Sequence, residues 1–336
     1  MDAVLAAYPG LEHAKVSALE GGLINRTFRV ETATAVFVLQ ALHPIFKAEL
    51  HTDIEAVTSH LAQKGLVTPR LLRTKDGALF QRDADGIVWR VMTFVNAVAF
   101  AKLPNLALAR EAGALVGRFH QATNDLVHTF AFQRLGVHDT PAHLRKLEAA
   151  LSQLKSHVHY TTIAPVGEEI LERAHALKPI DQSRTRIVHG DLKVSNLLFD
   201  DAGKGVCLVD LDTLGRMPLA YEMGDAWRSW CNPLGEDVSE TRFDLALFSE
   251  SAKGYLAVAH VDRQHRETLV AGIETIALEL SARFCADALL EVYFGWNAQK
   301  YPDRSTHNLV RASGQLSLAR SIDTQRATIE RTLEAA

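Results

Sequence analysis

A short segment in the second half of the chain carries side chains whose types and spacing suit the transfer of a phosphoryl group. Ile187–Phe199 reads IVHGDLKVSNLLF, so Asp191 follows His189 by two positions and precedes Asn196 by five. An aspartate held in a loop can accept a hydrogen bond from an attacking hydroxyl and take its proton. The side-chain oxygen of an asparagine is a hard donor of the kind that Mg²⁺ prefers. The segment therefore predicts a base, Asp191, beside a metal ligand, Asn196.

A second carboxylate follows at the end of an apolar strand. Val206–Asp212 reads VCLVDLD and places Asp210 nineteen residues after Asp191. We predict that Asp210 and Asn196 bind Mg²⁺ from the two arms of one hairpin, with Asp212 assisting through water and substrate phosphates completing the shell. A His-x-Asp followed by an Asn arises readily by chance. The ordered succession of loop, strand, turn, strand and aspartate is what favours a functional site.

Two neighbours of Asp191 have less certain chemistry. We expect His189 to brace the loop backbone rather than to transfer a proton. Lys193 is a candidate catalytic residue, because its ammonium group could donate to the transferring phosphoryl group and offset its developing charge. The alternative is a lysine that simply faces solvent, and the residue types do not separate the two.

The first part of the chain has the pattern of a small antiparallel sheet with one helix. Strand-like alternation runs through Ser17–Thr32 around a turn at Gly21-Gly22, and a helix is predicted at Glu49–Lys64. Further strands are predicted at Ala35–Leu42, Ala78–Arg82 and Ile87–Val95. Asn96 ends this region.

After Asn96 the pattern becomes helical, apart from residues 185–213. Helices are predicted at 106–126, 141–157, 164–177, 240–260, 264–292 and 306–334. In the exception, three strand-like runs surround a turn at Asp200–Gly203. A β-rich part followed by a helical part predicts the α+β class and a bilobal, protein-kinase-like fold. We place a nucleotide-binding lobe at 1–96 and a helical lobe with the catalytic loop and the acceptor site at 97–336.

Composition excludes several classes of protein. The formal net charge is −4 over 336 residues, which gives no general basic surface for nucleic acid. The three cysteines, Cys207, Cys231 and Cys285, have no metal-binding spacing and are expected to be buried thiols. The N-terminus lacks the pattern of a secretory signal, and no apolar run is long enough to span a membrane. We expect a cytoplasmic protein, and the sequence does not predict its oligomeric state.

With these residues identified, the chain resembles the aminoglycoside phosphotransferase and choline kinase superfamily. There an HGDLxxxN loop precedes a strand ending in aspartate and then an aromatic-acid segment, which here is Tyr221–Asp225 (YEMGD). Within the superfamily the chain is most similar to the N-acetylhexosamine 1-kinases, over nearly its whole length. The segments that carry this resemblance are GLINRT (22–27), VLQALHP (38–44), VHDTP (137–141), VDLDTL (209–214), MGDAWRS (223–229), ARFCADA (282–288), KYP (300–302) and HNLVR (307–311).

The resemblance implies a magnesium- and ATP-dependent phosphorylation of the anomeric hydroxyl of a sugar. It assigns Asp191 as the base and places Asn196 and Asp210 on the metal. The adenine would lie against the connection after the last strand of the first lobe, near Met92, Phe94 and Val95, and would be bound by backbone groups. In the sugar-kinase relatives an arginine and a tyrosine contact the sugar, and they match Arg283 and Tyr293.

Spacing alone leaves two roles open for Arg283. It lies at the edge of an apolar stripe on the helix predicted at 264–292, where it could reach a cleft. Alternatively, it forms a surface ion pair with Asp287 four residues on. Asp287 is itself a candidate for binding a cationic acceptor, together with Glu222, Asp225 and Glu279. Helix-surface pairing is the other explanation for these carboxylates, and Asp225 could instead anchor the catalytic loop.

Three positions depart from related patterns. Protein kinases place a lysine on the third strand, paired with a glutamate on the next helix and with the nucleotide phosphates; here Gln40 stands in that position and Glu55 lies on the helix. The sugar-kinase relatives also have glutamine there, so a changed grip on the phosphates is expected, not a loss of activity. Those relatives have a sugar-facing histidine where this chain has Leu23, which predicts a change in the acceptor that is used.

Two further functional classes remain open. One is a kinase of another small alcohol, such as an amino alcohol, homoserine or an aminoglycoside. The other is a pseudokinase that binds a nucleotide or a partner protein; Gln40 favours it, whereas the intact Asp191, Asn196 and Asp210 oppose it.

Overall fold

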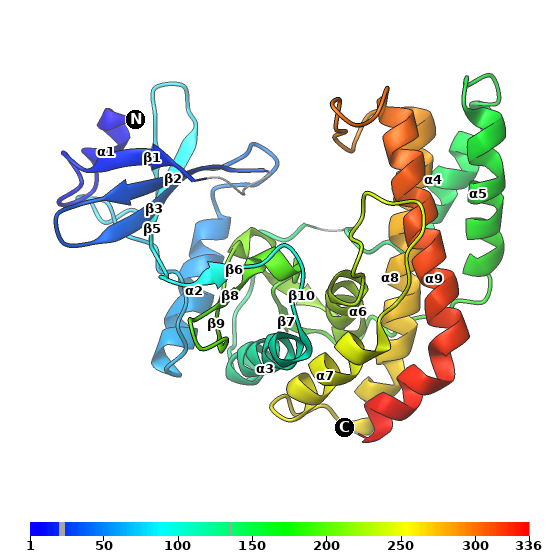
Figure 1. Ribbon diagram of the computed structural model, residues 1–336. Helices are drawn as coiled ribbons and strands as arrows, with labels where there is room; N and C mark the ends of the chain where they lie inside the picture. The colour runs from blue at the N-terminus through cyan, green and yellow to red at the C-terminus, as the bar shows by residue number, and fades with distance from the viewer. Residues whose placement is uncertain (20–23, 135, 336) are drawn as a thin grey trace.

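The N-terminal part of the molecule is a twisted antiparallel sheet (Figure 1). The structure is a computed structural model that describes residues 1–19, 24–134 and 136–335. The five strands lie in the order β1-β2-β3-β5-β4, with bounds β1 Lys15–Ala18, β2 Arg26–Glu31, β3 Val36–Ala41, β4 Gln81–Arg82 and β5 Val88–Thr93. Helix α2 (Leu50–Gln63) follows β3 as predicted. Strand β4 is shorter than predicted because Ala78 is hydrogen-bonded back to Thr74 in a turn.

The two faces of this sheet have different partners. Because successive residues of a strand point to opposite faces, Leu39 and Val91 pack in one core with Tyr8 and the short helix α1 (Asp2–Leu5). The neighbouring positions Gln40 and Arg90 are paired across β3 and β5 and face the other way. The side chains of Gln40 and Arg90 are thereby directed toward the rest of the molecule.

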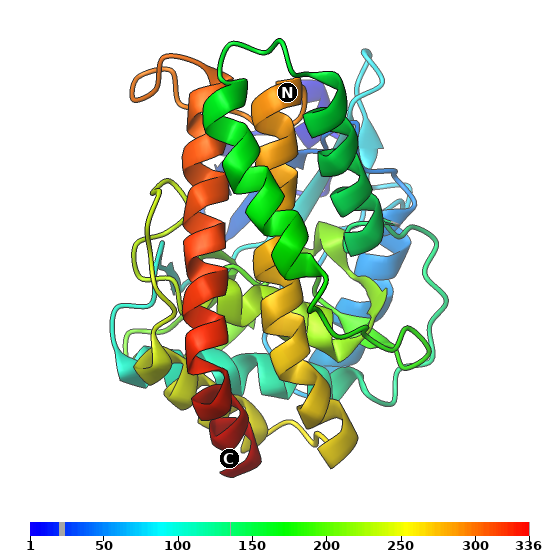
Figure 2. The same ribbon diagram turned by 90° about the vertical axis from the view of Figure 1, so that its right-hand side faces the viewer.

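Long helices form most of the C-terminal part. Their bounds are α3 Leu106–Thr123, α4 Thr140–Gln153, α5 Tyr160–Ala174, α6 Leu219–Trp230, α7 Leu245–Leu256, α8 Arg263–Leu290 and α9 Arg304–Ala335. Helix α8 is central, because α4, α5, α6 and α9 all pack against it. Figure 2 shows α5, α8 and α9 running side by side. The six predicted helices are confirmed, and α6 is an addition.

Residues 185–213 differ in detail from the single hairpin that we predicted. Strands β8 (Leu197–Phe199) and β9 (Gly205–Leu208) form that hairpin, and β6 (Val98–Ala99) joins its edge. Strand β7 (Arg186–Val188) instead pairs with β10 (Gly215–Met217) in a separate ribbon. The β6–β8–β9 sheet and the β7–β10 pair together fix the position of the segment that carries Asp191, Asn196 and Asp210.

Helix α6 lies very close to α8 because both helices have a glycine where they meet. A Cβ on Gly272 would come within 2.0 Å of the carbonyl oxygen of Ala220, and one on Gly224 within 2.6 Å of the backbone of Gly272. This contact places Glu222 of α6 against the loop that follows β7.

The remaining sequence expectations on buried thiols and membrane spans agree with the structure. Cys207, Cys231 and Cys285 are buried and free. Within residues 1–19, 24–134 and 136–335, no helix has the length and apolar character needed to cross a bilayer.

Candidate active site

The loop that follows β7, residues 189–196, brings three predicted side chains into contact. It leaves β7, passes Asp191 and Lys193, and enters a short 3₁₀ turn, Val194–Asn196. Nζ of Lys193 lies 2.7 Å from Oδ2 of Asp191, and Nδ2 of Asn196 donates to the backbone carbonyl of Asp191 at 2.8 Å and to its Oδ2 at 3.1 Å. Asp210 completes the cluster, with its carboxylate 3.8 Å from Nζ of Lys193.

The loop is held from below by buried polar groups. The Glu222 carboxylate on α6 accepts hydrogen bonds from the backbone N–H groups of His189 at 2.8 Å and Gly190 at 3.0 Å. The His189 ring bonds the carbonyl of Val209 at 2.9 Å, so it braces the backbone as expected. Gly190 has a φ of +81°, and a Cβ there would lie 2.4 Å from the carbonyl of Thr213, so only glycine fits.

The anchor of the loop is therefore Glu222 and not Asp225. The Asp225 carboxylate is bonded instead to Arg228, at 2.8 Å. Burial alone would raise the pKa of Asp225, but Arg228 and His138 hold it below its usual value. Because both carboxylates sit on α6 within three positions of each other, sequence spacing could not distinguish their directions.

Asp210 has the surroundings of a metal ligand. Its backbone is left-handed, with φ +65°, a conformation that aspartate adopts more readily than most residues and that clusters at active sites and ligand-binding positions. Burial, and after it the neighbouring Asp212, raise the pKa of Asp210 to about 6, so its environment favours an added cation. The ammonium group of Lys193 supplies part of this positive charge. Burial alone would lower the Lys193 pKa, but Asp191 and Asp210 together raise it.

The donor set suits magnesium bound together with a nucleotide. No group of three or more His, Cys, Asp or Glu side chains in the described ranges could hold a metal by itself. Asn196 uses its Nδ2 for Asp191, and no hydrogen bond to its Oδ1 is present among the described residues. One amide oxygen and one carboxylate are few ligands, as in sites where phosphates and water complete the octahedron around Mg²⁺.

Arg90 is a charged residue at this site that the sequence analysis missed. Its side chain is 1% exposed and forms an ion pair with the fully buried Asp212. It also donates to Oε1 of Gln40, at 3.0 Å from Nε and 2.7 Å from Nη2. Asn25 donates to the same Asp212 at 2.6 Å. The first lobe is thus joined to the residue two positions after Asp210 by a buried charge pair.

A cavity of about 1120 Å³ opens in front of Asp191 and Asp210 and extends to Arg283, Tyr293 and Phe294. Most of its other charges are already paired. Arg228 binds Asp225 and Glu236, Arg311 binds Asp237, and Glu279 accepts from Thr140 and contacts the ring of His138. Polar groups in a pocket of this size can orient a small acceptor against the base.

Comparison with the profiles of known protein families identifies the family of this chain. The profile of the phosphotransferase enzyme family matches residues 15–259, well over half of the chain. The chain belongs to this family. Its Asp191, Asn196 and Asp210 all fall within the matched region of the phosphotransferase profile.

Individual relatives of this phosphotransferase have diverse names. A homoserine kinase of Methylocella silvestris is 29% identical over 238 residues, which are 68% of this chain and 70% of that protein. A homoserine kinase of Zymomonas mobilis is 22% identical, over 64% of this chain and 65% of its own length. An aminoglycoside phosphotransferase of Alicyclobacillus acidocaldarius has a similar structure, with a TM-score of 0.68, 16% identity and coverage of 100% and 97% of the two chains.

Two further solved structures share the fold. An aminopropanol kinase associated with a microcompartment has a TM-score of 0.64 at 16% identity, covering 99% of this chain and 98% of its own. The amicoumacin kinase hAmiN, solved in complex with AMP-PNP and Ca²⁺, has a TM-score of 0.63 at 16% identity, covering 95% and 91%. These likenesses confirm the bilobal, protein-kinase-like α+β fold of this phosphotransferase.

The predicted nucleotide residues fall into two groups. Gln40 lies at the site, where it also donates to Thr27 at 3.1 Å. Glu55 points elsewhere, because its carboxylate pairs with Arg73 at 3.2 Å and Arg70 at 3.8 Å. In the place of the lysine–glutamate pair of protein kinases, this chain has Gln40 accepting hydrogen bonds from Arg90.

Strand β5 ends at Thr93, two residues before the end that we predicted at Val95. Met92 lies inside the strand, paired with Val38 on one side and bridged to Leu71 on the other. The N–H of Phe94 still reaches the carbonyl of Val36 at 3.4 Å, and the carbonyl of Val95 accepts from Ala97 at 3.0 Å. Only Phe94 and Val95 of the three lie beyond the strand, where backbone groups can bind an adenine.

The predicted acceptor residues also have different positions in the structure. Arg283 and Tyr293 both line the cavity, and the Arg283 guanidinium lies 5.9 Å from the centre of the Tyr293 ring and 5.6 Å from that of Phe294. Asp287 is 1% exposed and accepts hydrogen bonds from the backbone N–H groups of residues 292–294 and from Asn308. It fixes the loop that carries Tyr293 instead of binding a substrate, and it forms no ion pair with Arg283. Leu23, Gly21 and Gly22 lie outside the described residues.

Proposed function

We propose that this protein transfers the γ-phosphoryl group of ATP to a hydroxyl group of a small polar acceptor. The observation that carries the proposal is the cluster of Asp191, Lys193, Asn196 and Asp210, of which Asp191 and Asp210 line a cavity of about 1120 Å³. It combines a base, a phosphate-binding cation and oxygen donors for a metal within a few ångström.

In the proposed reaction Asp191 orients the acceptor. Both of its described side-chain hydrogen bonds, from Lys193 and Asn196, end on Oδ2, so Oδ1 remains for the hydroxyl. The acceptor oxygen forms a bond to the γ-phosphorus as the bond to the β–γ bridging oxygen breaks, and Asp191 takes the hydroxyl proton. The products are ADP and a phosphomonoester. Lys193 donates to the non-bridging oxygens while charge develops on them.

Asn196 and Asp210 would hold Mg²⁺, which supplies neutralisation of the phosphate charge when bound. The adenine would bind backbone groups at Phe94 and Val95. The Arg90–Asp212 pair would keep the segment after Asp210 in a fixed position relative to the strands that cover the nucleotide. We keep residues 1–96 and 97–336 as the proposed lobes.

The first candidate acceptor is a free hexose or N-acetylhexosamine, phosphorylated on its anomeric oxygen. Two features support it. Tyr293, Phe294 and Trp296 form an aromatic wall of the cavity beside Arg283, and aromatic faces with a few placed polar groups are typical of small-ligand pockets. The segments that resemble N-acetylhexosamine 1-kinases include those carrying Arg283 and Asp225.

The second candidate is a hydroxy amino acid such as homoserine. In the described part of the chain Arg283 has aromatic neighbours but no carboxylate partner. A guanidinium group of this kind suits a substrate carboxylate, which it can bind through two hydrogen bonds. The names of the two homoserine kinases that the chain resembles support the same candidate.

The test is ADP release with Mg²⁺ against N-acetylglucosamine, N-acetylgalactosamine, glucose, galactose, homoserine, choline and kanamycin, followed by ³¹P NMR of the product. An anomeric phosphate on a hexose supports the first candidate, and O-phosphohomoserine supports the second. Arg283→Gln should raise the KM of the accepted substrate at least about tenfold while the KM of ATP stays unchanged. Arg242→Gln, at an exposed arginine outside the cavity, is the control. Absence of turnover with the whole panel would contradict the proposal and favour a nucleotide-binding pseudokinase.

A further inference from the structure

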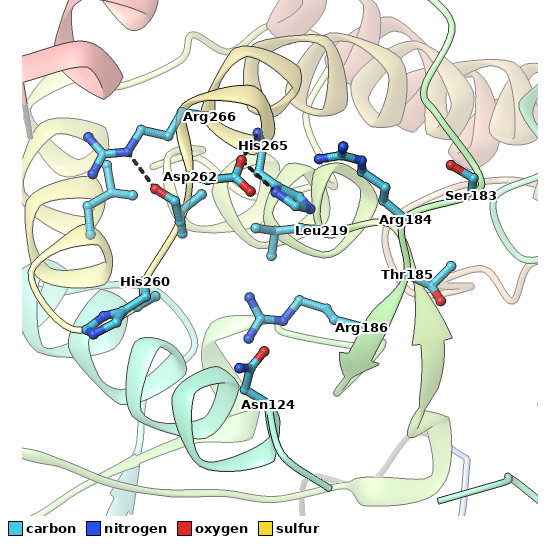
Figure 3. A pocket seen from close by; sticks show the side chains of 13 residues that line it. Asn124, Ser183, Arg184, Thr185, Arg186, Leu219, His260, Asp262, His265 and Arg266 are labelled. Atoms are coloured by element: carbon cyan, nitrogen blue, oxygen red, sulfur yellow. Dashed lines mark hydrogen bonds and ion pairs between the residues drawn. The ribbon is translucent and has the colours of Figure 1, made fainter. Parts of the chain in front are cut away.

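A second cavity, of about 820 Å³, lies in the helical part, and Figure 3 shows the side chains that line it. It is enclosed by the segment that leads into β7, by the end of α7 and by the start of α8. None of its lining residues lines the cavity that contains Asp191. Its volume lies within the range of small-molecule pockets, about 300–1,000 Å³.

Positive charge is concentrated in this cavity. Three arginines line it, Arg184, Arg186 and Arg266, against one carboxylate, Asp262. The protein as a whole has a formal charge of −4, so the excess is local. Arg184 and Arg186 are two residues apart as the chain enters β7, and alternate residues of an extended segment point to the same side. Figure 3 shows both side chains directed toward the hollow from this segment.

The single carboxylate of the cavity is already used. Asp262 is the N-cap of α8, where it accepts from the backbone N–H of His265 at 2.8 Å and contacts Nδ1 of its ring at 2.8 Å. This contact holds the His265 ring beside the cavity.

Among the described residues, Arg186 and Arg266 donate only to carbonyl groups, and no hydrogen bond of the Arg184 side chain is present. Arg186 donates to the carbonyl of His120 at 2.6 Å, and its Nε is buried without a hydrogen bond. Arg266 donates to the carbonyls of Val261 and Leu333 at 3.1 and 3.3 Å. Within the described residues none of the three guanidinium groups forms an ion pair. Guanidinium groups without a carboxylate partner keep N–H donors for an added anion.

We propose that this second cavity binds the phosphate group of a small molecule. Guanidinium groups match phosphate oxygens through paired hydrogen bonds. Arg184 and Arg186 lie on one side of an extended segment, with His265 opposite. This arrangement suits a phosphate dianion better than a ligand that carries one carboxylate group. The cavity is also much larger than a free phosphate ion, so a phosphomonoester fits the space as well as the charge. The positive end of the 28-residue helix α8 adds to the attraction.

The proposal is tested by calorimetric titration of the full-length protein with inorganic phosphate, glycerol 3-phosphate and acetate. The double variant Arg184→Gln/Arg186→Gln should weaken phosphate binding about tenfold or more, since charge-assisted bonds are lost. Arg184→Gln alone, at an exposed residue, should weaken it several-fold without affecting folding. Arg242→Gln, an exposed arginine outside both cavities, should bind phosphate like the parent protein.

The relative affinities of inorganic phosphate, glycerol 3-phosphate and acetate distinguish the possible outcomes. Tighter binding of glycerol 3-phosphate than of inorganic phosphate, lost in the Arg184 variants, identifies a phosphomonoester site. Binding of the two with equal affinity, also lost in the variants, identifies a site for phosphate alone. Phosphate binding that is unchanged in Arg184→Gln and in the double variant would place it in the catalytic cavity and overturn the proposal, as would acetate binding as tightly as phosphate.

Discussion

The Asp191 side chain is oriented by two donors that share one of its oxygens. Lys193 and Asn196 both bond Oδ2, and the backbone carbonyl of Asp191 takes a second bond from Asn196. This fixes the plane of the carboxylate without occupying Oδ1. A base used in phosphoryl transfer needs this kind of fixed orientation, because its contribution depends on geometry before acidity.

Replacing Asp191 with Asn should therefore remove the base and keep the fold. The amide has the same shape but cannot take the proton, so kcat should fall by about 10²–10⁴, while the KM of ATP should change little. Steady-state kinetics at saturating acceptor measures both. Asp201→Asn, in the exposed turn between β8 and β9, should leave both values unchanged. Turnover of Asp191→Asn at the parent rate would remove Asp191 from the mechanism.

Residues that function within one segment were accessible from sequence, whereas residues that meet across segments were not. Asp191, Asn196 and Asp210 belong to one loop and hairpin, so their spacing alone carries the prediction. Arg90 becomes meaningful only once β5 is paired with β3 and residue 90 lies opposite Gln40. Asp287 was misassigned because helical spacing does not reveal the reversal after α8, which brings the N–H groups of residues 292–294 onto its carboxylate.

At the scale of elements, β5 and the segment after β9 are joined by the Arg90–Asp212 ion pair. Both side chains are excluded from solvent. Removing one member of such a pair leaves an uncompensated buried charge and costs about 3–5 kcal/mol. Arg90→Met should therefore lower the free energy of unfolding by about this amount.

Adding Asp212→Asn to Arg90→Met should restore part of the lost stability, because the unpaired charge disappears. Urea denaturation of the parent, the two single variants and the double variant measures the coupling between the residues. Arg82→Met, at an exposed arginine on β4 of the same sheet, is the control. A double variant no more stable than Arg90→Met would mean that the charge of Asp212 is not what Arg90 balances.

Helices α5 and α9 are connected by a surface ion pair that depends on pH. Glu169 on α5 accepts from Arg320 on α9 and from Arg173 on its own helix. The hydrogen bond from Arg320 is the main reason that the pKa of Glu169 falls from 4.5 to about 2, against the opposing effect of burial. The folded protein then holds fewer protons than the unfolded chain as pH falls from about 4.5 to about 2. The ion pair therefore stabilises fully above this window and is lost through it.

Glu169→Gln should accordingly lower the melting temperature at pH 7. We expect a loss of about 1 kcal/mol, because the pair is partly exposed. The difference from the parent protein should shrink as the pH is lowered from about 4.5 towards about 2, because the parent then loses the stabilisation that this ion pair provides. Thermal melts across this range, with the exposed neighbour Glu168→Gln as control, measure it. A difference that stays constant with pH would assign the effect to packing.

Most helices were predicted from the sequence, and the main exceptions are helix α6 and the partner of strand β7. Most of the residues of α6 are buried, including Glu222 and Arg228. The sequence of α6 is nevertheless amphipathic, so the apolar period that identifies a helix was present and the prediction overlooked it. Local pattern identifies β7 as a strand but does not show that its partner is β10, which follows the intervening β8–β9 hairpin.

At the scale of the molecule, α2 belongs to the first lobe in sequence but is fastened to the second. Asp53 accepts from the backbone N–H groups of Ala131 and Phe132 and pairs with His128, and His60 and Lys64 both contact Asp125. The sheet and the helical part are therefore coupled through α2, through the Arg90–Asp212 pair and through the connection at residues 94–97. A ligand in the cleft between them should stabilise both parts together.

Nucleotide binding should thus be visible as one shifted unfolding transition. A ligand at 100 times its Kd adds about 2.7 kcal/mol of stability, which for a chain of this size corresponds to about 4 °C. We expect this shift with Mg²⁺ and AMP-PNP for the parent protein and for Asp191→Asn, because Asp191 faces the acceptor. Asp210→Ala should lose most of the shift, since it removes a metal ligand. Differential scanning fluorimetry with and without Mg²⁺ separates these cases. An equal shift for Asp210→Ala would show that the nucleotide binds without the proposed metal site, and two separate transitions would show that the lobes are not coupled.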